Sequence, residues 1–266
     1  MTPARCFSTL GCPELSLDQV FALARRHDVE AVELRALDGT IDLAARFADG
    51  FGSPAALAQH VKHAGVRIAA IDVSLHLVGT TDSEREQVLG LMPWVEALGV
   101  AYLRVFDGGK SADAAELAEA AKTVAWWREL KRARQWRADW IVETHDSLFT
   151  AAAIQRFTAA VPDVALLWDT HHTWKKGGED PLKTWSAIRA HVAHVHVKDS
   201  VADASERKGY RYTVPGTGEF PFRPLMQRLR ADGFTGCASI EWERFWIPTL
   251  GPLDEVLQAT IATGEW

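Results

Sequence analysis

Four consecutive β-branched runs of this sequence end in side chains that can bind a metal ion or move a proton. The runs end in 142-VETHD-146, 168-WDTHH-172, 194-HVHVKD-199 and 240-IEWER-244. Successive side chains of a strand point to opposite faces, so the alternation of each run selects which of these groups share the inward face. The inward residues predicted in this way are Glu143, Asp169, His196 and Glu241.

Three carboxylates and one imidazole form a hard, oxygen-rich ligand set. Such a set suits one divalent ion, Mn²⁺ or Mg²⁺ first, with Co²⁺ or Zn²⁺ as alternatives. A structural zinc site would instead use thiolates. His194 shares a face with His196 but lies one layer deeper, so His196 is the predicted ligand of the pair.

Each of these residues also has a structural explanation. Asp169 could cap the following turn, and His196 could be a hydrogen-bonded core histidine. Either glutamate, Glu143 or Glu241, could pair with a neighbouring arginine. We favour the metal site because all four residues fall at the ends of adjacent strands.

The elements that must position these residues are read from the hydrophobic pattern. Short β-branched runs alternate with longer amphipathic segments, such as 16–27 with Ser16 as N-cap and 111–132 with Ser111 as N-cap. Strict alternation of this kind predicts an α/β fold, a single-domain (β/α)₈ TIM barrel over residues 1–266, with the site at the carboxyl ends of the strands. The strands are expected at 4–8, 29–34, 67–72, 100–106, 138–143, 163–168, 192–197 and 236–241.

Composition narrows the class of protein. The 266 residues are 47% hydrophobic and 24% charged, and the net charge of −6 does not favour nucleic acid as a partner. We expect no secretion signal and no membrane span, because the sequence lacks a basic segment followed by a long apolar run. Three scattered cysteines, Cys6, Cys12 and Cys237, do not make a disulfide framework, so we expect a cytoplasmic protein.

The motifs together resemble the sugar phosphate isomerase/epimerase superfamily. These xylose-isomerase-like barrels include ketose 3-epimerases, inosose dehydratases and, more distantly, endonuclease IV. The resemblance covers roughly residues 4 to 262. It rests on AVEL at 31–34, VETHD at 142–146, WDTHH at 168–172, AHVHVKD at 193–199, PGTGEF at 215–220 and SIEWE at 239–243.

The resemblance implies roles for particular residues. Glu143, Asp169, His196 and Glu241 match the four ligands of one divalent metal, while His172 and Arg211 match positions near the metal or substrate. In the implied mechanism, the metal binds a carbonyl and an adjacent hydroxyl oxygen, which acidifies the neighbouring C–H and stabilises an enediolate. Glu143 and Glu241 would remove and return the proton from opposite sides.

Further residues near the strand ends are predicted to contact substrate: His145, His76, Arg104, Trp174 and Trp246. Each has an alternative role. Arg104 could pair with a barrel carboxylate such as Glu33, His145 could be a surface histidine, and the tryptophans could belong to the core or to a subunit contact. Lys198 could bind an oxyanion, although a solvated loop lysine is the commoner outcome.

The predicted function is a metal-dependent isomerase or epimerase acting on a small sugar or polyol ketone. A dehydratase of an inosose- or dehydroshikimate-like substrate is the alternative, because it begins with the same proton removal. A non-catalytic sugar-binding protein is less favoured. An abasic-site endonuclease is also less favoured, because Tyr210 and Tyr212 stand where its acid and histidine are expected. We read PGTGEF as a plain turn, and the sequence leaves open the substrate, its phosphorylation and a homodimer or higher homo-oligomer.

Overall fold

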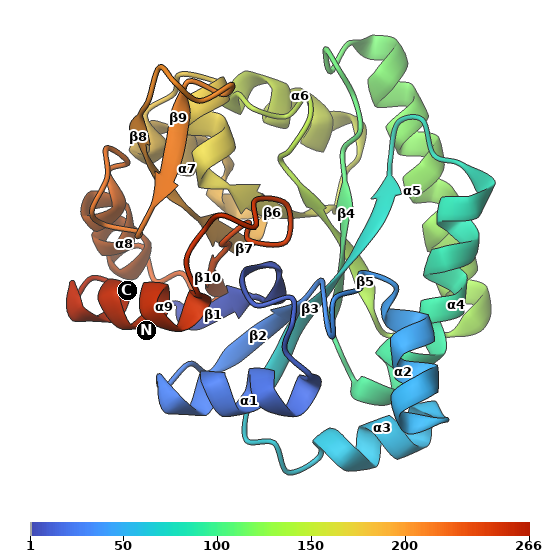
Figure 1. Cartoon of the computed structure of the whole chain (residues 1–266). Coiled ribbons are helices and arrows are strands. Elements are labelled where there is room, and N and C mark those ends of the chain that lie inside the picture. Colours follow the sequence, from blue (N-terminus) through green and yellow to red (C-terminus); the bar gives the residue numbers. More distant parts are fainter. Residues whose placement is uncertain (1) are drawn as a thin grey trace.

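Eight strands close into a parallel barrel in the computed structural model, which describes residues 2–266 (Figure 1). Around the barrel the strands follow the order β1-β10-β7-β6-β5-β4-β3-β2. The predicted TIM barrel is therefore confirmed. The strands are β1 Ala4–Ser8, β2 Ala31–Leu34, β3 Arg67–His76, β4 Tyr102–Phe106, β5 Asp139–Glu143, β6 Ala165–Asp169, β7 Val192–Val197 and β10 Cys237–Ile240.

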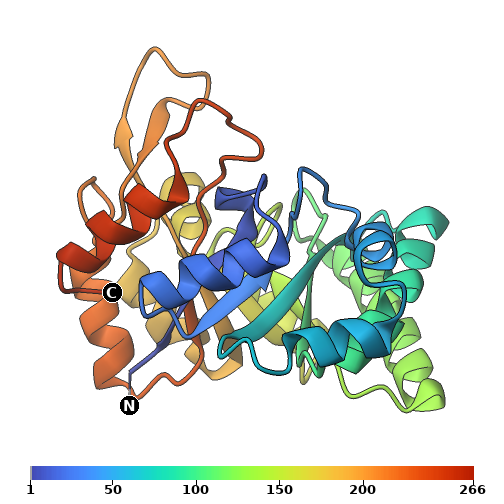
Figure 2. The same ribbon diagram turned by 60° about the horizontal axis from the view of Figure 1, so that its bottom comes forward.

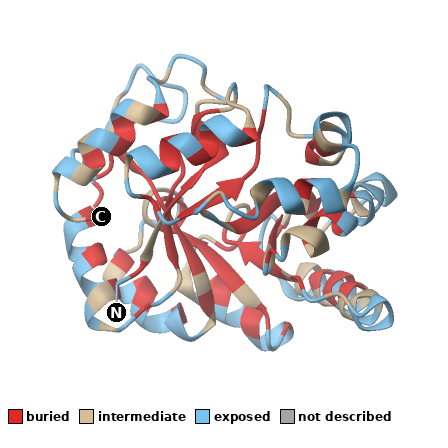
Figure 3. Cartoon of the chain, turned by 90° about the horizontal axis from the view of Figure 1, so that it is seen from below, coloured by how far each residue is buried: buried red, intermediate tan, exposed pale blue. Residues whose placement is uncertain are grey.

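Helices surround the barrel and pack their apolar faces against it, while their outer faces are exposed (Figure 3). The helices thus cover the outer face of the sheet, and inward-pointing side chains of the strands fill the barrel. Within residues 2–266, no helix is both long enough and apolar enough to cross a membrane. The helices are α1 Leu17–Arg26, α2 Leu43–Phe51, α3 Pro54–Val61, α4 Asp82–Leu98, α5 Ala114–Arg134, α6 Ala151–Ala160, α7 Pro181–Ile188, α8 Phe222–Ala231 and α9 Leu253–Ala262, with helical turns η1 Thr9–Gly11, η2 His172–Lys176 and η3 Arg189–His191.

Two helix starts test the predicted caps. Ser16 caps α1 as expected, since its side chain accepts from the N–H of Gln19 in a capping box. The prediction of Ser111 as the cap of α5 is wrong. Asp113 caps this helix, because its carboxylate accepts from the first free N–H groups of α5, and Ser111 only donates its hydroxyl to Asp113.

A short antiparallel hairpin, which the sequence pattern did not reveal, follows β7. Strand β8 Asp199–Ala202 pairs with β9 Tyr210–Thr213, and the hairpin projects from the end of the barrel (Figure 2). The following PGTGEF turn is held by the Asp199 carboxylate, which accepts from the N–H groups of Gly216, Gly218 and Phe220. These donors are thus occupied by Asp199. A Cβ on Gly218 would lie 2.3 Å from Asp199 Oδ1, so the turn needs glycine there.

Candidate metal centre and its surroundings

Four buried side chains converge where β5, β6, β7 and β10 end. Each supplies one potential ligand atom, and these atoms lie within 4.8 Å of one another. The four strands are neighbours in the barrel, so their carboxyl ends deliver their side chains to one point. The residues are Glu143, Asp169, His196 and Glu241.

One atom of each residue lacks a hydrogen-bond partner within the described residues 2–266, although it is buried. These atoms are Glu143 Oε2, Asp169 Oδ2, His196 Nδ1 and Glu241 Oε2. Cationic side chains approach the three carboxylate atoms, but not in hydrogen-bond geometry. His196 Nδ1 also lies 3.2 Å from Glu241 Oε2, so charged neighbours hold the four side chains in place while these atoms stay outside regular hydrogen bonds. The donor set fits a divalent cation.

Glu33, on β2, orients His196 towards this point. His196 Nε2 lies 2.8 Å from Glu33 Oε1, and the other oxygen of Glu33 lies 2.7 Å from His194 Nε2. A proton on Nε2 directed at Glu33 leaves Nδ1 free to bind a metal. His194 contacts Glu33 and lies outside the four-residue cluster, in the deeper layer that the strand alternation predicts for it.

The charges of Glu33 and its two histidine neighbours stabilise the contact that orients His196. Burial opposes ionisation of Glu33, yet the imidazoles of His196 and His194 hold the pKa of Glu33 well below its usual range. Burial also lowers the pKa of His194, but the Glu33 carboxylate outweighs this effect and raises it to about 9. Glu33 is therefore an anion between two imidazoles.

Replacing Glu33 with glutamine should weaken metal binding by about 10- to 100-fold, the usual cost of losing the partner that orients a ligand histidine. Titration calorimetry with Mn²⁺ measures this directly. His194→Asn is the matched control, because it removes the other partner of Glu33 and leaves the Glu33–His196 contact in place. An unchanged affinity in Glu33→Gln would show that His196 does not depend on this carboxylate.

Lys198 lies inside the site, so the expectation of a solvated loop lysine is wrong. Only 3% of Lys198 is exposed. Its Nζ is 2.8 Å from Asp169 Oδ2 and 2.9 Å from Glu243 Oε1, and it also contacts Glu241. The signal was present in the sequence, because position 198 continues the alternation of His194 and His196.

The carboxylates keep Lys198 charged. Burial alone would lower the pKa of Lys198, but the surrounding carboxylates, Asp169 first, raise it well above its ordinary value. Tyr212 from the hairpin donates its hydroxyl to Glu243 at 2.8 Å. Glu243 thus links the hairpin to the metal centre, a role that sequence reasoning missed.

Arg104, on β4, pairs with the carboxyl groups of Glu143 and Asp72 and not with Glu33. Its Nε is 3.3 Å from Glu143 Oε2, and its other end is 3.4 Å from Asp72 Oδ2. Glu33, the partner suggested by the sequence, is instead taken by the two histidines. Burial, and then the negative charge of Glu33, raise the pKa of Asp72 well above its usual range.

A cleft of about 80 Å³ opens over the cluster. Three of the predicted substrate-binding residues line it, and one of them, Trp246, is 54% exposed at its edge. Lys198, for which the sequence left an oxyanion-binding role open, joins them together with Glu243 and Arg35. The full lining is Leu10, Arg35, Arg104, Phe106, Glu143, His145, Lys198, Glu241, Glu243 and Trp246.

Two other predicted residues lie just outside the cleft. The backbone N–H of His172 donates to Asp169 Oδ1 at 2.9 Å, so this residue helps to fix the orientation of a candidate ligand. Burial, then the charge of Lys198, holds the pKa of His172 well below its usual value, and the ring is neutral. His76 lies 2.6 Å from Glu84 and stacks on Phe106, which separates it from the cleft.

The structure does not bring Arg211 or Trp174 to the cleft. The alternation of β9 turns Tyr210 and Tyr212 towards the ring of His171, so Arg211 points outward with 59% of its side chain exposed. Trp174 packs edge-on against Phe220 at 5.4 Å between ring centres. Both positions follow from the hairpin and its turn.

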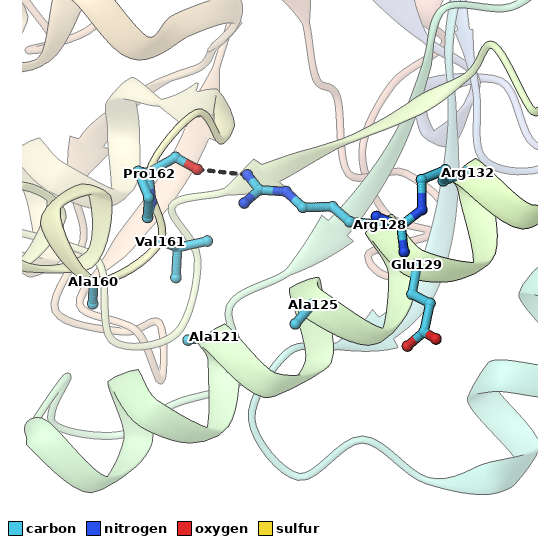
Figure 4. Close-up of a pocket in the computed structure, with 8 residues that line it drawn as sticks. All are labelled: Ala121, Ala125, Arg128, Glu129, Arg132, Ala160, Val161 and Pro162. Carbon is cyan, nitrogen blue, oxygen red and sulfur yellow. Dashed lines mark hydrogen bonds between the residues drawn. The ribbon is translucent and has the colours of Figure 1, made fainter.

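A larger cavity of about 380 Å³ lies outside the barrel, between α5 and α6 (Figure 4). Its walls are mainly alanines and arginines, and the Arg128 guanidinium donates across it to the carbonyl oxygen of Pro162 at 2.5 Å. It contains none of the candidate metal ligands. Size alone therefore does not identify the site, and the convergence of ligand atoms does.

A family model described as xylose isomerase-like TIM barrel matches residues 21–262. An inosose dehydratase of Klebsiella pneumoniae is 36% identical over 110 residues, and one of Lacticaseibacillus casei is 33% identical over 109 residues. Both alignments cover 36% of this chain, and they cover 37% and 36% of the respective relatives, so the match spans about a third of those proteins.

Solved structures share the fold over nearly the whole chain. A probable 3-DHS dehydratase of Bacillus anthracis superposes with a TM-score of 0.78 at 18% identity, over 99% of this chain and 98% of its own. A 3-keto-D-glucoside 4-epimerase of E. coli superposes with a TM-score of 0.68 at 15% identity, over 98% of both chains. At these identities the likeness concerns the fold alone.

Proposed function

The chain belongs to the xylose isomerase-like TIM barrel family, and from this premise we propose that it is a metal-dependent enzyme acting on a small sugar or polyol ketone. In the proposed reaction, a proton is removed from the carbon next to the carbonyl. The observation that carries the proposal is the convergence of four buried side chains, each with one potential ligand atom, and these atoms lie within 4.8 Å of one another.

The residues that line the cleft would have different roles in this reaction. A bound divalent ion would act as a Lewis acid that polarises the carbonyl. Glu143 and Glu241 both line the cleft and are the carboxylates that would take and return the proton. The charged groups of Arg104 and Lys198 would hold the oxygen atoms of the substrate. Trp246, at the edge, offers an apolar face to its C–H groups.

We place dehydration ahead of isomerisation or epimerisation as the completed reaction. Both begin with the same proton removal, and they differ in whether a hydroxyl group then leaves. The support for this order is that the curated relatives above 30% identity are inosose dehydratases. An epimerase remains the second candidate, because Glu143 and Glu241 come from separate strands and could serve opposite faces of a substrate.

Metal content and C–H exchange test the proposal together. We would measure bound metal in the purified protein before and after chelation. We would then follow exchange of substrate C–H protons in deuterated water with an inosose, 3-dehydroshikimate and a panel of ketoses. The expected result is about one ion per chain and exchange that is lost on chelation and restored by Mn²⁺ or Mg²⁺.

The products separate the two candidates. Loss of water from the exchanging compound would identify a dehydratase, and a changed configuration or carbonyl position would identify an epimerase or isomerase. A protein that takes up no metal and catalyses no exchange would favour the alternative of a non-catalytic sugar-binding protein with the fold of an enzyme family.

A further inference from the structure

Arg35 is a buried cation without a direct ion pair. It follows β2 directly, and only 4% of it is exposed. Its guanidinium donates to the Ser74 hydroxyl at 2.8 Å and to the backbone carbonyl of Asp72 at 3.5 Å, both neutral acceptors. Across residues 2–266, no carboxylate oxygen lies within the 4.0 Å ion-pair distance of this guanidinium.

The neighbouring cations differ from Arg35 in this respect. Arg104 reaches two carboxylates, and Lys198 reaches three. Removing a charge from water costs several kcal/mol unless a partner compensates, so an unpaired buried arginine is expensive to maintain. Burial, then the charge of Arg104, lowers the pKa of Arg35 to about 10, against the weaker opposing effect of the more distant carboxyl groups of Asp72, Glu143 and Glu241. Arg35 is therefore charged at neutral pH.

Arg35 stands between two spaces. On one side it lines the cleft over the metal centre. On the other it lines a cavity of about 560 Å³ between α2 and α4, where the carboxylates of Asp42 and Glu86 would repel an anion. The cleft also holds carboxylates, but a bound divalent ion and Lys198 would neutralise them. An anionic group is therefore favoured on the cleft side of Arg35.

We propose that Arg35 binds a carboxylate of the substrate, so that the preferred substrate is a polyhydroxy ketone bearing a carboxylate rather than an uncharged one. The planar fork of a guanidinium matches the two oxygens of a carboxylate, and a charge-assisted pair of this kind is the strong form of hydrogen bond. The proposal rests on the proposed function, because it names the substrate class of the same cleft.

Binding of a matched pair of ligands tests the role of Arg35. Shikimate and methyl shikimate share one polyhydroxy ring and differ in the charge of the carboxyl group. In the metal-loaded wild type we expect shikimate to bind roughly tenfold more tightly, or better, than the ester. In Arg35→Met this preference should disappear while the affinity for the ester and the metal content stay unchanged. Arg211→Met, an exposed arginine outside the cleft, should retain the preference.

Thermal unfolding supplies a second measurement. A purely structural Arg35 would make Arg35→Met less stable than the wild type. Removal of an unpaired buried charge should instead leave the unfolding temperature unchanged or higher. Arg35→Lys keeps the charge without the fork, and it should retain part of the preference for the acid.

Several results would overturn the proposal. They are equal affinity of the wild type for acid and ester, no binding of either ligand, or an acid preference that survives in Arg35→Met. None of these results would contradict the proposed function, which is tested separately by metal-dependent C–H exchange. Exchange with an inosose but not with 3-dehydroshikimate would support the proposed enzyme function and contradict the preference for a substrate that bears a carboxylate.

Discussion

Glu241→Gln should abolish metal-dependent C–H exchange and weaken metal binding. The glutamine side chain keeps the size of the residue but removes one anionic candidate ligand and one of the two proposed general bases. Loss of a positioned general base alone lowers turnover by about 10²- to 10⁴-fold, and loss of metal adds to this effect. Glu143→Gln should behave in the same way, because Glu143 is the corresponding candidate ligand at the end of β5.

Two assays separate the contributions. Titration calorimetry gives the metal affinity, and proton exchange at saturating metal gives the effect on proton transfer. Glu206→Gln, an exposed carboxylate on the hairpin loop, is the control for the change of net charge. Full exchange activity in either cleft variant would refute the assignment of these two glutamates.

Lys198→Met should strongly destabilise the metal-free protein. Lys198 lies among Asp169, Glu241 and Glu243 with almost no exposure, so its removal leaves buried carboxylates without their cation. Breaking a buried ion pair from one side costs about 3–5 kcal/mol. Urea unfolding of the chelated protein should show a loss of free energy of unfolding of this order.

Metal should reverse much of this loss. A divalent ion bound by Asp169 and Glu241 replaces the missing positive charge and stabilises the folded state by mass action. Lys208→Met is the matched control, because Lys208 also approaches Glu243, at 3.7 Å, but 45% of its side chain is exposed. If Lys198→Met were as stable as the wild type after chelation, Lys198 would not be the charge that balances the empty ligand set.

The sequence alone predicted the barrel and the four-residue cluster, and the physical reason is that both depend on local patterns. The period of two along each strand selects the inward side chains, and the (βα) repeat places the carboxyl ends of parallel strands at one mouth. Asp169 thus ends β6 and Glu241 follows β10, as the strand ends suggested. The motifs around these residues also sufficed to indicate the family.

Only the tertiary structure decided which charges meet. Glu33 and His196 are 163 residues apart in the chain, and no local pattern indicates that one orients the other. The same is true of Lys198, whose burial depends on carboxylates from two other strands, and of Arg35, whose lack of a direct ion pair is visible only when every neighbour is known. Arg211 points outward because an unpredicted hairpin sets its register. A linear pattern fixes which way a side chain points from its own strand, whereas its charge partners and its exposure depend on chain segments far away in sequence.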